Sequence, residues 1–402
     1  MRTLWLVCVV AVVASLGAAA LAAAAEAGGP PDVEVHGWME TRFYSGVAVD
    51  VTQDESGAIV DEEEDSAVKT ERISLSGLVR LADGKSGYAE IYIHPWLPND
   101  NPSFLYLESL YLDVPAGAGA RYRIGKGRSL AFGIVPSYGA RKTSNYSPLA
   151  EAFTMDRAVG IQYARKVGDD ELAFGLFNSQ RVGSRLIGQA ADLQMDRGST
   201  KTTTVAHLCS RDVTDNRSGQ LETSLRVGRQ LGYLNLGLSG RLGALDETDS
   251  ATLAKSFATY NGTNRTRLNY GVDATYKRMP LYGTFEYYRG SLGGIRQTGY
   301  GVLLGVEPTP QCTGMWRELS SVCKGLYLRY VNLDIDVPAV PTVSTTWDTQ
   351  QYAISYVLPI RCKQTSLPKW IQIEYERNTE DAPAPLDSVP NNVFFIELFT
   401  AF

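Results

Sequence analysis

The chain has 402 residues, a formal net charge of −6 and a mean hydropathy of −0.14. This acidic balance argues against nucleic acid as a partner, because phosphate binding needs clustered lysine and arginine. The length fits either two or three soluble domains or one large β-domain, and the 22 tyrosines and 38 glycines favour many short strands and turns.

Residues 1–27 have the pattern of an export signal. Arg2 is followed by the apolar core LWLVCVVAVVASLGAAAL, and AAAAEA offers small-residue cleavage sites after Ala25 or Ala27. A retained transmembrane helix is the alternative, since the apolar run is long enough to span a bilayer. The alanine-rich end before GGPP favours cleavage. We therefore expect a signal peptide at 1–27 and a mature domain at 28–402.

Beyond the signal, apolar and polar residues alternate in one stretch after another, and no apolar run approaches the length of a membrane helix. In LGYLNLGLSGRLG, Leu234, Leu236 and Leu238 share one side of an extended chain, and Ser239 and Arg241 share the other. RISLSGLVRL, RLNYGVDATYK and WIQIEYE repeat the period of two. The pattern predicts strands with one apolar face and one charged face.

The number of strands follows from parity. The alternation gives seventeen candidate strands, but a closed antiparallel barrel with both chain ends on one rim needs an even number. We therefore exclude 201–211 and assign it to a long loop. The remaining sixteen candidates are 33–45, 68–82, 86–94, 104–115, 119–127, 157–166, 170–178, 219–228, 231–243, 266–279, 281–291, 297–306, 325–335, 348–359, 369–378 and 391–402.

The links between these strands alternate between short and long. The short ones include ADGKS, VGDD, GRQLG and KRMP. The long ones are 46–68, with the acidic run 61–65 as solvated loop, 95–103, 128–156, 179–218, 245–265, 335–347 and 379–391. Outer-membrane barrels show this asymmetry, with tight periplasmic turns on one rim and long outside loops on the other. Two links break this alternation: 292–297 is short where a long link is expected, and 307–324 is long where a short link is expected.

The last stretch, NNVFFIELFTAF, ends on a bare phenylalanine. Inside a bilayer an unpaired backbone amide has no water to bind, so a sheet there must close on itself. We expect the final strand to pair with the first and Phe402 to sit at the membrane interface. The sequence thus predicts an all-β fold, a transmembrane antiparallel β-barrel of about 16 strands in the cell outer membrane.

Four cysteines follow the predicted signal peptide. An exported protein meets an oxidising compartment, where pairing is favoured. Cys312 and Cys323 close the short segment CTGMWRELSSVC and are the expected disulfide, which leaves Cys209 and Cys362 as the other pair. Four cysteines permit three connectivities, and none of the spacings matches a zinc site.

Residues 122–180 carry a family resemblance. A strand ends in Gly125–Lys126, Phe132–Gly133 opens a long loop, an aromatic-to-arginine segment runs from Phe153 to Arg157, and a strand ends at Asn178. This arrangement resembles the phosphate-selective porin O and P family, in which the loop folds inward and constricts the channel. The terminal phenylalanine resembles the assembly signal of Gram-negative outer-membrane barrels. The resemblance implies sixteen strands, a homotrimer and passive passage of anions.

The charges that would act on a solute lie in one stretch. No acidic residue occurs between Asp113 and Glu151, and Arg121 and Arg123 alternate with apolar neighbours so that they should face the lumen. The predicted constriction residues are Arg121, Arg123, Lys126, Arg128, Arg141, Lys142 and Arg157. Other predicted lumen-facing charges are Arg72, Arg80, Glu90, Lys277 and Glu286.

These charges favour a water-filled channel for passive diffusion of small hydrophilic solutes, with a weak preference for anions and phosphate as one candidate. Several acidic residues lie on the same polar side of the predicted strands and weaken that preference, among them Glu40, Asp273, Glu374 and Glu397. Basic residues on outside loops also suit lipopolysaccharide phosphates, which is the alternative interpretation. The expected partners are outer-membrane lipid and lipopolysaccharide, small solutes or anions, and further copies of the chain in a homotrimer.

Catalysis is not expected. His36, His94 and His207 are scattered, with no serine or cysteine motif nearby to form a nucleophile–base pair. No spacing suggests a metal site or a cofactor, and the expected partners do not include nucleic acid. The alternative functions are a structural or adhesion barrel without a transport role, and an outer-membrane barrel enzyme.

Overall fold

The computed structural model describes residues 31–53, 59–95, 105–134, 142–154, 157–178, 181–186, 189–192, 202–203, 207–211, 220–256, 263–336, 348–360, 368–381 and 392–402. The predicted signal peptide lies outside these residues, as does Arg141. Cys362, and with it the alternative bridge to Cys209, also lies outside them.

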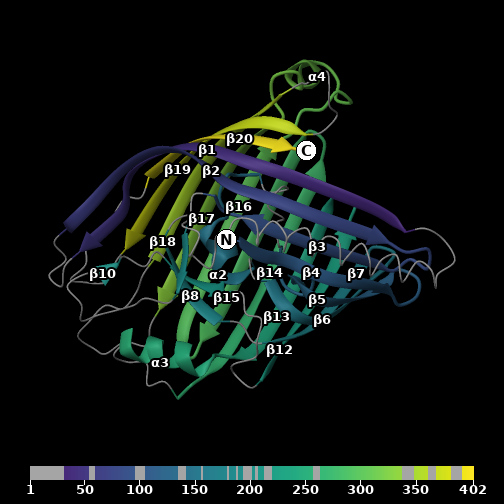
Figure 1. Cartoon of the computed structure of the whole chain (residues 1–402). Coiled ribbons are helices and arrows are strands. Elements are labelled where there is room, and N and C mark those ends of the chain that lie inside the picture. The colour runs from purple at the N-terminus through teal and green to yellow at the C-terminus, as the bar shows by residue number, and fades with distance from the viewer. Residues whose placement is uncertain are drawn as a thin grey trace, which may run out of the picture.

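Sixteen antiparallel strands of the described chain form a closed barrel (Figure 1). In the first half they are β1 (Asp32–Gln53), β2 (Ile59–Arg80), β3 (Ser86–Ile93), β4 (Leu105–Pro115), β5 (Ala120–Arg128), β6 (Arg157–Val167), β7 (Asp170–Asn178) and β12 (Leu221–Leu231). In the second half they are β13 (Leu234–Ala244), β14 (Thr266–Arg278), β15 (Leu281–Leu292), β16 (Ile295–Val306), β17 (Gly325–Asp336), β18 (Asp348–Pro359), β19 (Lys369–Asp381) and β20 (Asn392–Ala401).

The segment excluded from the predicted barrel does not contribute a wall strand. Within 201–211, β10 (Thr202–Thr203) pairs only with the end of β1, and β11 (His207–Arg211) joins a separate small sheet with β8 (Arg181–Leu186) and β9 (Gln189–Asp192). The strands on either side of this link, β7 and β12, pair directly with each other, from Asn178 opposite Leu221 to Asp170 opposite Arg229. The prediction of sixteen strands is therefore confirmed.

The barrel closes where its last strand meets its first. β20 pairs with β1 from Trp38 opposite Ala401 to Val47 opposite Asn392. Phe402 extends this seam, because its backbone N–H donates to the Gly37 carbonyl at 2.8 Å and its own carbonyl accepts from the Gly37 N–H at 2.9 Å. The terminal stretch thus completes the wall, as predicted.

β1 and β2 extend further than predicted. They pair out to Thr52 opposite Asp61, so the acidic run 61–65 lies in a strand rather than in the loop that we expected. The register shifts near Glu40 and near Gly46, which lets a long hairpin bend away from the barrel wall. The two strands are the long purple ribbons of Figure 1.

The two rims differ as the link lengths predicted. One rim carries tight turns such as the Gly232–Tyr233 link, and the other carries the long links, including the one with α3 (Glu247–Ser256). The two links that depart from the alternation of short and long are also present in the structure. β15 and β16 are joined by Gly293–Gly294, with positive φ of 64° and 108° that glycine adopts without strain. α4 (Met315–Leu319) lies in the long link on the turn rim, near the C-terminus (Figure 1).

The expected disulfide in this link is absent from the structure, since the thiols of Cys312 and Cys323 are both free. Each sulfur has a different local environment. Cys312 Sγ lies 3.5 Å from Thr309 Oγ1, whereas Cys323 ends the turn after α4, where its N–H donates to Leu319, and is buried. Burial raises the pKa of the Cys323 thiol, which disfavours the reactive thiolate.

The strand faces divide as the alternation predicted. On β13, Leu236 and Leu238 are exposed on the outside, while Ser239 and Arg241 are buried inside. Exposed leucines, valines, isoleucines and tyrosines recur on the outer side of most strands. A closed sheet that is apolar outside and charged inside suits a barrel set in lipid. Among the described helices, none combines the length and apolar character needed to cross a membrane.

Leu238→Arg should lower the free energy of unfolding by about 2–4 kcal/mol, because Leu238 is exposed near the middle of β13 and the change places a charge on the lipid face. Asn235→Arg, whose side chain points to the inside, is the matched control and should cost far less. Denaturant unfolding of the barrel in lipid vesicles, followed by tryptophan fluorescence, measures both changes. Equal costs would contradict the assignment of the faces.

Candidate functional site

The link between β5 and β6 folds back against the inner wall of the barrel. Its described parts are residues 129–134 and 142–154, which include the short helix α2 (Pro148–Phe153). Ser147 caps this helix by accepting a hydrogen bond from the Ala150 N–H at 3.1 Å, and all six helical residues are buried. We call this link the lumen loop.

The first part of the lumen loop reaches strands on the inner wall far from its own. The Gly133 N–H donates to Ser239 Oγ of β13 at 3.1 Å, and the Ile134 N–H donates to the Tyr288 hydroxyl of β15 at 3.1 Å. Phe132 and Phe153 both pack against the Tyr288 ring, with centroids 5.5 and 5.6 Å away. The loop is therefore anchored on the β13–β15 wall.

A second anchor joins residues 143–145 to β1, β17 and β19. Arg329 of β17 donates to the Asn145 carbonyl at 2.9 Å and to the Thr143 hydroxyl. Arg42 of β1 donates to the Ser144 carbonyl and to Asn145 Oδ1, both at 3.0 Å. We call this group, with the two carboxylates described next, the loop latch.

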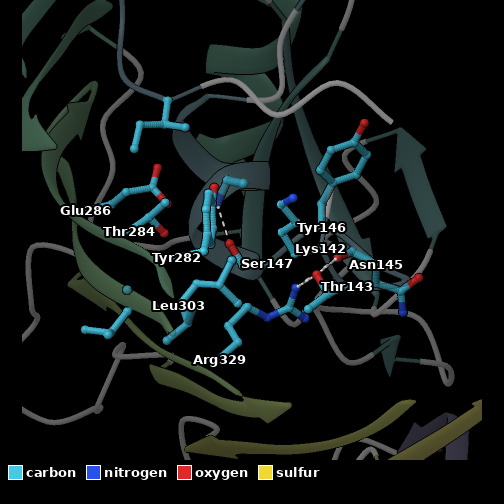
Figure 2. Close-up of a pocket in the computed structure, with 15 residues that line it drawn as sticks. Lys142, Thr143, Asn145, Tyr146, Ser147, Tyr282, Thr284, Glu286, Leu303 and Arg329 are labelled. Atoms are coloured by element: carbon cyan, nitrogen blue, oxygen red, sulfur yellow. Dashed lines mark hydrogen bonds between the residues drawn. The ribbon is translucent and has the colours of Figure 1, made fainter. Parts of the chain in front are cut away.

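Carboxylates of β19 complete the loop latch. Glu374 accepts the Ser144 N–H at 2.7 Å, and Glu376 accepts the side-chain amide of Asn145 at 3.1 Å. Glu376 also forms an ion pair of 2.7 Å with Arg329, whose position in the site is visible in Figure 2. Arg42, Arg329 and Glu376 thus bind both an opposite charge and the loop, and Glu374 binds the loop and the Gln372 amide. The loop is fixed largely by bonds that neutralise buried charge.

Most of the predicted constriction residues are engaged by carboxylates. Arg123 forms a two-pronged pair with Asp113, with both contacts at 2.9 Å, and lies over the Tyr111 ring. Lys142 binds Glu307 at 2.6 Å. Lys126 donates to the Leu107 carbonyl at 2.8 Å. The described positive charge of the lumen is therefore largely compensated.

Arg128 and Arg157 converge on one carboxylate, that of Glu108, at 2.9 and 2.6 Å. Arg128 also donates to the Tyr146 hydroxyl of the lumen loop at 3.0 Å. Strict alternation from Arg123 would have turned Arg128 away from the lumen. A positive φ of 128° at Gly125 breaks the alternation, and a register shift beside Glu108 brings its carboxylate to the same place.

Of the other predicted lumen charges, Arg72 and Glu90 lie beside the Glu108 cluster, whereas Arg80 and Lys277 lie at the turn rim. Arg80 pairs with Asp32 at 2.9 Å and with Glu34 at the turn rim, and Lys277 is exposed at the same rim. Arg72 lies over the Tyr92 ring, and Glu90 accepts from Ser74 and Tyr88. Arg121 is exposed near the start of β5.

Sequence reasoning missed several ion pairs that the structure forms. Glu222 binds both Arg241 and Arg267 at 3.2 Å, and Arg226 pairs with Asp273. On the opposite wall, Glu397 binds Arg42 at 3.0 Å. The sequence alone assigned these side chains to the inner face, because each alternates with an outward apolar residue. It could not pair them, because their partners lie on other strands.

Comparison with known proteins finds the fold among outer-membrane β-barrels. No family model and no curated protein sequence matches the chain. The outer membrane channel DcaP of Acinetobacter baumannii matches with a TM-score of 0.59 at 12% identity, over 92% of this chain and 97% of that one. Salmonella typhi OmpF, in complex with daunomycin, gives 0.59 at 9% identity over 92% and 97%. OmpT, an outer membrane protein of Vibrio cholerae in trimer form, gives 0.53 at 12% over 92% and 99%. At these low sequence identities, the structural matches establish the barrel fold alone.

Arg329→Met should lower the free energy of unfolding by about 3 kcal/mol, because it leaves the carboxylate of Glu376 buried without its cation. The two side chains are 7% and 0% exposed. Arg229→Met is the matched control, since Arg229 and Asp170 are 64% and 65% exposed and 3.7 Å apart. Denaturant unfolding in vesicles measures both variants, and equal stability would show that the loop latch contributes nothing.

Proposed function

We propose that the protein is an outer-membrane porin, a water-filled channel through which small hydrophilic solutes diffuse passively. The observation that supports this most is the closed sixteen-strand wall, apolar outside and charged inside. A barrel of this size is too wide for wall side chains to fill, so it encloses an aqueous channel. The lumen loop then narrows the channel, and its bonds to β1, β13, β15, β17 and β19 hold it in the lumen.

Charge selectivity in this proposal is weak. The positive groups Arg123, Arg128, Arg157 and Lys142 each bind a carboxylate, so they present little uncompensated charge to a passing ion. Arg121 is exposed on the lumen parity and favours anions. We therefore propose a general pore with a slight anion preference; phosphate selectivity, which the family resemblance implies, is the narrower form of the proposal.

The proposal assigns no catalytic role to the described histidines. His36 lies at the turn rim beside Glu34 at 3.2 Å, and His94 bonds the Glu71 carbonyl and stacks on Tyr106. In the described ranges no three His, Cys, Asp or Glu residues are grouped to hold a metal ion. The alternatives are a structural or adhesion barrel and an outer-membrane barrel enzyme, and conductance separates both from a porin.

We also propose that the chain assembles as a homotrimer in the outer membrane, in contact with lipid and lipopolysaccharide. The trimer form of Vibrio cholerae OmpT, which shares the fold, supports this assembly. The exposed apolar outer wall supplies the surface for lipid and for neighbouring copies.

The purified protein, reconstituted in planar bilayers, should produce discrete current steps in potassium chloride. It should also make proteoliposomes swell in small sugars, because neutral solutes pass a water-filled channel as well. Retention of the folded, heat-modifiable barrel on gels is the control for assembly. A folded barrel that conducts no ions and admits no sugar would contradict the porin proposal and favour a structural role.

Replacing Arg121, Arg123, Arg141 and Lys142 together with Gln should lower the anion-to-cation permeability ratio, because their positive charge lies on β5 and the lumen loop. The reversal potential in a potassium chloride gradient measures the ratio, and a phosphate gradient tests the narrower proposal. The matched control replaces Arg165 and Arg229, which are exposed on the outer face of β6 and β12. An unchanged reversal potential in the fourfold variant would place the selectivity elsewhere.

A further inference from the structure

A pocket lies between the lumen loop and the inner wall of β15, β16 and β17 (Figure 2). Its cavity volume is about 80 Å³, several times the space that one water molecule needs. Leu303 and Val331 give it an apolar side, and Ser147 and Thr284 contribute hydroxyl groups. The volume and the lining suit a small organic molecule of a few heavy atoms better than a bare ion.

One carboxylate of the pocket has no cationic partner in the described structure. Glu286 faces Asp273 of β14 across the sheet, but Arg226 pairs with Asp273. Glu286 itself accepts one hydrogen bond, from the Tyr288 hydroxyl at 3.0 Å. Figure 2 shows Glu286 and Thr284 together on one side of the pocket, away from Thr143 and Asn145. The acceptor capacity of this carboxylate is therefore only partly used.

The cations of the same pocket are already bound. Arg329 is held by Glu376 at 2.7 Å and by the loop residues Thr143 and Asn145. Lys142 is held by Glu307 at 2.6 Å. Each positive charge is offset by a carboxylate, whereas Glu286 has none to offset it. The uncompensated charge that the pocket presents to a solute is thus negative.

We propose that this pocket binds small organic cations, with the ammonium or guanidinium group at Glu286 and the apolar body against Leu303 and Val331. A charged N–H donor satisfies a carboxylate more strongly than a neutral one does. A metal ion is a poorer occupant, because the described pocket offers a single carboxylate and Ca²⁺ or Mg²⁺ requires several oxygen ligands. The inference rests on the porin proposal, since it places the site in the channel lumen.

A cation bound here would interrupt the current whichever small ion carries it. The probe is n-butylammonium, added to single channels of the wild-type protein in planar bilayers. Brief, concentration-dependent closures are expected. Butyrate and n-butanol, which have the same apolar body without the cation, should cause none. Equal effects of all three probes would overturn the proposal while the channel itself stands.

Glu286→Gln should raise the half-blocking concentration of n-butylammonium at least tenfold, because it removes the charge and keeps the shape. Glu286→Asp, which keeps the charge, should retain the block. Glu171→Gln is the matched control: its carboxylate lies outside the pocket, 3.4 Å from Lys166, and its loss should leave the block unchanged. An unaltered block in Glu286→Gln would overturn the inference. Absence of any wild-type conductance would instead overturn the porin proposal.

Discussion

The structure depends on one constraint: inside hydrocarbon every backbone N–H and C=O must find a partner within the protein. A sheet meets this demand only by closing, and here β20 closes on β1 through a ten-residue register that Phe402 and Gly37 extend. Closure fixes the even number of strands. Because neighbouring side chains point to opposite faces, an apolar outer face leaves the alternate, mostly polar positions of the wall strands to the lumen.

That second consequence creates the chemistry of the interior. Charges directed inward meet each other across a confined space, and an unpaired one would be costly, so they pair. In this chain the pairs also hold the lumen loop, since Arg42, Arg329 and Glu374 bind its backbone directly. The polar groups of the lumen therefore serve two roles. Those in the loop latch fix the shape of the channel, and those left uncompensated, such as Arg121 and Glu286, act on solutes.

The fold was largely predictable because the alternation that lipid imposes is local in sequence. The exposed Leu236 and the buried Arg241 are five residues apart on one strand, and their parity alone assigned their faces. The parity argument that removed 201–211 from the wall was also correct. The long extension of β1 and β2 was missed, because an acidic run such as 61–65 carries no alternation.

The site was less predictable because its contacts join distant parts of the chain. Arg42 and Glu397 are separated by 355 residues, and Arg329 and Asn145 by 184. No local pattern announces such a pair. The interruption at Gly125, and the register shift beside Glu108, likewise depend on how neighbouring strands meet. Alternation thus assigned Arg123 to the lumen but gave no warning that Asp113 would neutralise it.

The family resemblance can be understood in the same terms. The residues that carry it have structural roles in seating the lumen loop: a Cβ at Gly125 would clash with the Leu110 backbone, and one at Gly133 would lie 2.6 Å from the Tyr288 hydroxyl. Phe153 packs on that same tyrosine, and Arg157 binds Glu108. None of these requirements involves a phosphate ion. The likeness is therefore evidence for an inward-folded loop, and a phosphate site would need cations that this loop leaves uncompensated.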